Sequence, residues 1–162
     1  WVCLASAYCP ADKLPASPRF LTHVRSPQSV PAGHSAGIVL DHEIDVSRGD
    51  WLLQPDSYPP SRTLEATVAW LDDTPLVAGR LYWALHGHRW VKAKVQRIVH
   101  RLDVHTLERQ PATELAANAI GDIELVLQQP LATQAYAQSR ALGALVLVDT
   151  ASHRTAGAVL VR

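Results

Sequence analysis

Trp90-Val-Lys-Ala-Lys-Val-Gln-Arg97 is the stretch of sequence that decides the fold class. Every second residue from Trp90 to Gln96 is aromatic or polar, whereas the alternate set from Val91 to Arg97 is mainly apolar. Because successive side chains of an extended chain point to opposite faces, this alternation predicts a β-strand. We expect its apolar face to cover a hydrophobic core and its mixed polar face to meet water.

Shorter runs of strand type lie on both sides of this stretch, with turn residues between them. Turns are expected at Asp72–Pro75 and around Gly87, and residues 131–143 are expected to form a helical turn or a long loop. Such strands, with turn signals roughly every 8–12 residues, predict an all-β sandwich or barrel. The other ranges expected to form strands are 36–40, 50–54, 64–71, 80–85, 101–108, 121–128, 144–149 and 155–161.

The first 60 residues are rich in proline and glycine. Each proline removes a backbone donor and clashes with the preceding helical turn, so helices of normal length are not expected there. Residues 1–18 show no clear period, and we expect them to be irregular.

Composition bounds the class of protein. A chain of 162 residues, with 48% hydrophobic and 19% charged residues, is long enough for one or two small globular domains. Lysine plus arginine and aspartate plus glutamate both total 15, so the formal charge is zero. Nucleic-acid binders usually carry a basic excess that neutralises phosphates, and the sequence therefore predicts no nucleic-acid partner.

The sequence also predicts a chain that does not enter a membrane. No apolar run approaches the roughly 20 residues of a membrane helix, and no signal-peptide pattern is visible. Cys3 and Cys9 are too few for a structural zinc site, and we expect free thiols in a reducing cytoplasm. The chain begins at Trp1 and contains no methionine, so we expect a fragment or a processed piece.

Familiar catalytic motifs are absent from the sequence. It contains no Gly-x-x-x-x-Gly-Lys-Ser/Thr phosphate loop, no glycine fingerprint between strand and helix, and no Gly-x-Ser-x-Gly nucleophile elbow. We therefore expect no catalytic residue, no bound cofactor and no nucleotide hydrolysis by this chain alone.

Histidines offer one metal hypothesis. His86 and His88 stand two residues apart, as two ligands on one strand face would, and His100 and His105 follow. Gly87 between the first two is more typical of a hairpin turn at the surface. The pattern favours the turn, and we expect no metal site.

Two further clusters have a chemical and a structural interpretation. Asp72 and Asp73 resemble a carboxylate dyad, but adjacent strand residues point to opposite faces, so turn capping is favoured. Lys92 and Lys94 share a face with Trp90, an arrangement that could stack a base. A solvated strand face, on which lysine stems cover apolar surface, is favoured instead.

A resemblance to a known family begins at His42-Glu-Ile-Asp-Val-Ser-Arg-Gly-Asp-Trp-Leu52. This segment resembles the "DEIDISRGD-L" segment of the large, GTP-binding subunit of bacterial sulfate adenylyltransferase, which also occurs fused to adenylylsulfate kinase. The resemblance covers about residues 30–162. Further matches, in the family's order, are Val30–His34, Ala66–Leu71, Pro75–Gly79, Leu115–Leu125, Pro130, Tyr136, Arg140, Gly143–Asp149 and Thr155–Ala158.

The resemblance implies a translation-factor arrangement, in which a GTPase domain precedes two β-barrels. Residues 1–59 would be a partial second barrel, with 1–29 divergent or irregular. Residues 60–162 would be an antiparallel β-barrel of the elongation-factor domain III type. His42, Ser139 and Leu142 depart from the family's Asp, Asn and Thr.

The function implied by the resemblance is a coupling role in sulfate assimilation. In that family the large subunit hydrolyses GTP to drive the ATP-dependent adenylylation of sulfate by a separate small catalytic subunit. The implied partners are that small subunit and the GTPase domain, in the cytoplasm. GTP and ATP with Mg would belong to the parent complex, and this chain would bind no cofactor.

Loop residues that match the family are the candidates for interface or loop-structural roles. We expect Gly49 to supply a turn with positive φ, Ser47 or Asp50 to cap that turn, and Arg48 to pair with a carboxylate. The complete candidate set is Asp45, Arg48, Gly49, Asp50, Asn118, Gly121 and Arg140.

Two other classes of protein remain open at this stage. One is a barrel from another translation-factor-like GTPase, which docks RNA or protein. The other is an independent β module that binds a small ligand or a metal, an interpretation that the histidines favour.

Overall fold

The structure is a computed structural model that describes residues 19–21, 30–31, 34, 37–39, 47–51, 53 and 58–162. The chain divides into two compact units, Trp1–Ser57 and Tyr58–Arg162. In the described part of the first unit, β1 (Arg19–Leu21) pairs antiparallel with β2 (Gly37–Val39). Residues 1–18 and Asp45, about which expectations were stated above, lie outside the described residues.

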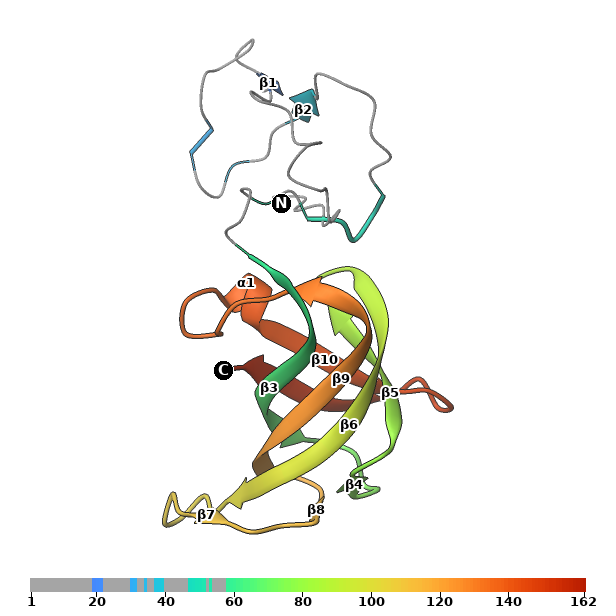
Figure 1. Cartoon of the computed structure of the whole chain (residues 1–162), viewed down its shortest axis with the longest axis vertical. Coiled ribbons are helices and arrows are strands. Elements are labelled where there is room, and N and C mark those ends of the chain that lie inside the picture. Colours follow the sequence, from blue (N-terminus) through green and yellow to red (C-terminus); the bar gives the residue numbers. More distant parts are fainter. Residues whose placement is uncertain are drawn as a thin grey trace. The chain divides into compact units, whose positions relative to one another are not determined.

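The second unit is built around a closed antiparallel barrel (Figure 1). Its six strands follow the order β5-β10-β11-β3-β9-β6, and β6 pairs back to β5. The prediction of an all-β antiparallel barrel is confirmed. The elements of this unit are β3 (Pro60–Trp70), β4 (Leu76–Val77), β5 (Leu81–His86), β6 (Arg89–Leu102), β7 (Arg109–Gln110), β8 (Glu114–Leu115), β9 (Ile120–Ala132), α1 (Arg140–Gly143), β10 (Ala144–Asp149) and β11 (Thr155–Val161).

The hydrophobic core fills the inside of the barrel. Inward positions alternate with outward ones along each strand, as the sequence predicts, and on β3 the inward set runs from Leu64 to Trp70 with at most 4% exposed. The Trp70 ring meets the Tyr82 ring edge to face, with centroids 5.4 Å apart. Such a core is the main source of stability of a small barrel.

The alternation of β6 is broken at Gln96. The register of β6 against β9 shifts between Val95 and Arg97, so Gln96 is an extra, bulged residue. The sequence placed Arg97 on the apolar face with Val95, and this was wrong. The bulge turns the Arg97 side chain outward, where it is 62% exposed and pairs with Glu124.

The prediction of a separate strand at 101–108 was also wrong. β6 continues to Leu102, and the chain then turns instead of forming a new strand. Asp103 Oδ1 accepts hydrogen bonds from the backbone N–H of His105 and of Thr106, at 2.9 and 3.1 Å. Leu107 has φ 59°, so side-chain capping and a left-handed residue close the turn.

Different elements lie at the two ends of the barrel (Figure 1). The short helix α1 lies at one end, within the segment for which a helical turn or loop was expected. Ser139 caps it by accepting a hydrogen bond from Leu142 N at 3.3 Å. The β4–β8 pair and β7 lie at the other end.

Candidate interaction surface

The β5–β6 hairpin decides between the two interpretations of the histidine pair. Gly87, with φ 60°, and His88 form its turn, as expected, and His88 is exposed. His86 was expected at the surface, and this was wrong. It occupies an inward position of β5 and is 1% exposed, because Tyr82, Ala84 and His86 alternate into the barrel.

His86 has a structural role inside the barrel. Its Nε2 lies 3.1 Å from the Leu142 carbonyl oxygen, so the ring ties β5 to α1. Burial lowers the pKa of His86 from its ordinary value. Among the described residues, no three His, Cys, Asp or Glu side chains are grouped so that they could hold a metal ion.

The Asp72-Asp73 pair also has a local explanation. Asp72 Oδ1 accepts a hydrogen bond from the backbone N–H of Thr74 at 2.8 Å, which is the expected turn capping. The Asp73 side chain is 88% exposed and lies 3.9 Å from Arg154. The two carboxylates therefore point to different surroundings.

The candidate turn at Arg48–Asp50 lies in the first unit. Gly49 has φ 102°, and Asp50 Oδ2 accepts a hydrogen bond from the backbone N–H of Ser47 at 2.7 Å. Asp50 N also donates to the Ser47 carbonyl at 3.1 Å. Arg48 is exposed at the tip of this turn.

The candidates in the barrel lie at its two opposite ends. Asn118 has φ 63° and donates its N–H to the Trp70 carbonyl at 2.8 Å. At Gly121, a Cβ would lie 2.6 Å from the His100 carbonyl oxygen, so the backbones approach closely there. Arg140 is the exposed first residue of α1, at the other end. The structure does not bring these residues into one site.

A polar cluster on the outer barrel wall was missed by the sequence reasoning. Asp122 is 7% exposed and accepts three contacts on its carboxylate. Thr67 Oγ1 donates to Oδ1 at 2.6 Å, while His100 Nε2 and Arg162 Nη1 lie 2.7 and 2.6 Å from Oδ2. Thr67 on β3 and His100 on β6 both lie opposite Asp122 of β9, so the strand register brings these three together, and Arg162 follows the end of β11.

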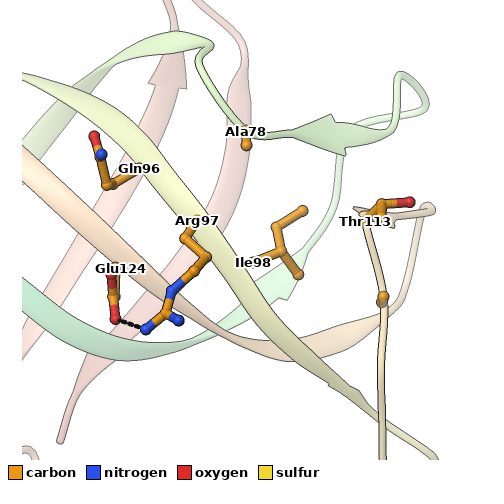
Figure 2. A pocket seen from close by; sticks show the side chains of 7 residues that line it. Ala78, Gln96, Arg97, Ile98, Thr113 and Glu124 are labelled. Carbon is orange, nitrogen blue, oxygen red and sulfur yellow. Dashed lines mark hydrogen bonds and ion pairs between the residues drawn. The ribbon is translucent and has the colours of Figure 1, made fainter.

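A shallow groove lies beside the β6 bulge (Figure 2). Its volume is about 380 Å³, and the Arg97–Glu124 ion pair lines part of it. The remaining lining residues combine small apolar side chains with one amide and one hydroxyl: Ala78, Gln96, Ile98, Ala112 and Thr113. With its charges already paired to each other, the groove presents no uncompensated charge for a ligand.

A mixed aromatic and basic face covers the outside of β5 and β6. Trp90 is 51% exposed, and Lys92 Nζ lies 5.3 Å from the centre of the half-buried Trp83 ring. Lys92 pairs with Trp83 and Lys94 with Leu81 across the two strands. The ammonium group of Lys92 therefore makes a cation–π contact with Trp83 across the two strands.

Fold and surface together define an antiparallel β-barrel domain with an exposed aromatic and basic face on its outer wall. The chain belongs to the GTP-eEF1A C-terminal domain-like family, whose model matches residues 63–162. A crystal structure of sup35 complexed with GDP has the same fold, with a TM-score of 0.60 and 16% identity, over 66% of this chain and 26% of that chain. In the described part, no helix is long and apolar enough to cross a membrane.

Among curated proteins, the chain is similar to sulfate adenylyltransferase subunit 1 of Laribacter hongkongensis, with 38% identity over 80% of this chain and 27% of that protein. It is 42% identical to the bifunctional enzyme CysN/CysC of Xylella fastidiosa, over 78% of this chain and 20% of that protein. The resemblance to the large subunit of sulfate adenylyltransferase is thus confirmed. The chain spans about a quarter of the length of these relatives.

Proposed function

We propose that this chain is the non-catalytic β-barrel part of a sulfate adenylyltransferase large subunit and acts in sulfate assimilation. The observation that carries the proposal is the 38% identity to sulfate adenylyltransferase subunit 1 over 132 residues. That length exceeds the barrel, so the similarity also includes residues of the first unit.

The proposed mechanism is mechanical coupling. The barrel would carry a conformational change that accompanies GTP hydrolysis to the surface of a catalytic partner. A closed barrel suits this role, because a densely packed core moves as one body and transmits displacement between its ends. The coupling would reside in two interfaces with different affinities in two states, not in a reactive side chain.

The proposed partners are the small catalytic subunit and the GTPase domain, in the cytoplasm. GTP and ATP with Mg would be bound by the parent complex and not by this chain. In this proposal, residues 1–59 contribute part of a second barrel, which in the sequence follows the GTPase domain and precedes the C-terminal barrel. Arg48 and Arg140 are exposed and are proposed to contact partners, whereas Asn118 and Gly121 have structural roles.

The proposal is tested by co-purification of the whole chain with the small catalytic subunit of a bacterial sulfate adenylyltransferase. The experiment is run with and without a separately supplied GTPase domain. Retention of the small subunit on the folded chain supports the docking role. If neither component binds a chain that circular dichroism shows to be folded, the coupling role fails.

A further inference from the structure

The outer wall of β5 and β6 carries a face on which apolar side chains lie beside two lysines that form no ion pair with the described residues. We call it the Trp90 face and define it by six residues. Leu81 and Trp90 are 52% and 51% exposed, and Val126 of the neighbouring β9 is 36% exposed. The complete set is Leu81, Trp83, Trp90, Lys92, Lys94 and Val126.

The strand register makes these residues one continuous surface. Leu85 lies opposite Trp90, and Leu81 lies opposite Lys94, which in turn lies opposite Val126. Inward neighbours such as Val91 and Ala93 are buried in the core. The backbone beneath the outward residues is therefore held in place by the barrel wall, and a partner that docks on them does not have to order that backbone.

The cations of this face have no carboxylate partner among the described residues. Lys92 makes a cation–π contact with the Trp83 ring. Neither Lys92 nor Lys94 forms an ion pair with a described residue. The other cations along β6 do have partners, since Arg97 pairs with Glu124 and Arg101 donates to Gln110 at 2.9 Å. Arg89 also donates, to the amide oxygen of Gln129 at 3.0 Å. Among the described residues, Lys92 and Lys94 are thus the cations of β6 without a side-chain hydrogen bond or an ion pair.

We infer that the Trp90 face binds an acidic protein surface with an apolar recess that receives the Trp90 ring. An exposed tryptophan beside cations is the composition of a binding hot spot, where an aromatic anchor enters a pocket and charges select the partner. Resting on the proposed function, the inference commits to the small catalytic subunit as the protein that supplies this acidic surface.

The aliphatic residues favour a protein partner over RNA. A single-strand binding surface stacks successive bases on open aromatic faces within a basic groove. Here Lys92 already covers the Trp83 ring, and Leu81 and Val126 flank the lysines with apolar surface. The formal charge of zero gives no general attraction for phosphate.

Titration calorimetry of the whole chain with the purified small subunit tests the inference. Trp90→Ala is expected to weaken binding by about 30-fold or more, as truncation of a hot-spot aromatic does. The charge reversal Lys92→Glu/Lys94→Glu is expected to weaken it by at least about tenfold at low salt. Affinity of the unaltered chain should fall as salt rises, and this dependence should be smaller in the reversed variant.

The matched control is Arg101→Glu/Arg109→Glu, which reverses two cations at the opposite end of β6 and on β7. It should bind as the unaltered chain does. Equal binding by the unaltered chain, by Trp90→Ala and by the lysine reversal overturns the inference and leaves the proposed function standing. Failure of the unaltered chain to bind overturns both. Binding of a mixed-sequence single-stranded RNA that the lysine reversal abolishes, with binding of the small subunit unchanged, assigns the face to RNA and overturns the inference.

All variants are first compared by circular dichroism and thermal unfolding. Trp90 and both lysines are exposed, so their replacement leaves the core intact. If Trp90→Ala unfolds, the lysine reversal and the salt dependence of the unaltered chain still decide the outcome.

Discussion

His100 Nε2 lies 2.7 Å from Oδ2 of Asp122, across the β6–β9 pairing on the outer wall of the barrel. Arg162 reaches the same oxygen from the end of the chain, and Thr67 holds the other oxygen from β3. One carboxylate therefore links β3, β6 and β9 with the residue that follows β11. Polar networks of this kind specify register, because a shift of one residue would separate every partner.

Removal of this carboxylate should destabilise the barrel. We expect Asp122→Ala to lower the free energy of unfolding by about 2 kcal/mol, because three donors lose their acceptor. The half-exposed Arg162 limits the loss, since water can solvate it. Urea unfolding measures the change, with Asp73→Ala as the control, because the Asp73 side chain is 88% exposed. Equal stability of the two variants would show that the cluster contributes nothing.

Replacement of Tyr82 by phenylalanine should stabilise the barrel, in contrast to the loss expected for Asp122→Ala. Tyr82 is 1% exposed, and its hydroxyl has no hydrogen-bond partner among the described residues. A buried hydroxyl without a partner is unfavourable, so Tyr82→Phe should raise the free energy of unfolding by about 1 kcal/mol at pH 7. The ring contact with Trp70 is retained. A measured loss of stability would mean that the hydroxyl has a partner in solution.

The same tyrosine should make the stability of the barrel depend on pH in the alkaline range. Burial raises the pKa of Tyr82 from 10.0 to about 12, so the unfolded phenol ionises first. The barrel therefore keeps the stability that it has with neutral Tyr82 below about pH 10, and it loses part of that stability as the pH rises towards 12. Unfolding at pH 9 and pH 11 should differ less in Tyr82→Phe than in the unaltered chain. Tyr136→Phe, which leaves Tyr82 in place, should retain the full difference.

Much of the barrel could be predicted because its signal is local. Alternation and turn residues placed the strands near 64–71, 80–85, 121–128, 144–149 and 155–161 without knowledge of their neighbours. Bulges could not be predicted in this way. The extra residue at Gln96 exists only relative to β9, so nothing within the run from Trp90 to Arg97 announces it.

In the candidate surface, too, the residues related by local spacing could be predicted, and those related only by strand pairing could not. Trp90, Lys92 and Lys94 were placed on one face by their spacing alone. The Asp122 cluster was missed, because Thr67 and Asp122 are 55 residues apart and meet only once the register of β3 and β9 is fixed. A polar residue between inward-facing Gly121 and Ile123 was the available signal, but it does not name the partners.

Acid should weaken the barrel through His86. Burial lowers the pKa of this histidine below its ordinary 6.5, so the unfolded chain takes up a proton that the folded chain does not. The contribution of neutral His86 is present above about pH 6.5 and is lost as the pH falls through the lower folded pKa. His86→Gln keeps a donor towards Leu142 O but does not titrate, so unfolding between pH 7 and pH 5 should depend less on pH. His88→Gln, at the exposed turn position, should leave the dependence unchanged; an identical effect of both variants would remove the assignment to His86.

A substitution at Gly121 distinguishes a structural role of this residue from a role in an interface. A Cβ at this position would lie 2.6 Å from the His100 carbonyl oxygen and 2.9 Å from Leu115 Cδ2, so the β6 backbone would have to move. We expect Gly121→Ala to cost about 2–3 kcal/mol in urea unfolding, as overpacking of a well-packed site does. Gly37→Ala is the control, because the nearest atom to its Cβ would be Leu21 Cβ at an ordinary 3.5 Å. A stable Gly121→Ala chain that nevertheless fails to retain the small catalytic subunit would contradict the structural assignment, and it would place this end of the barrel in the interface.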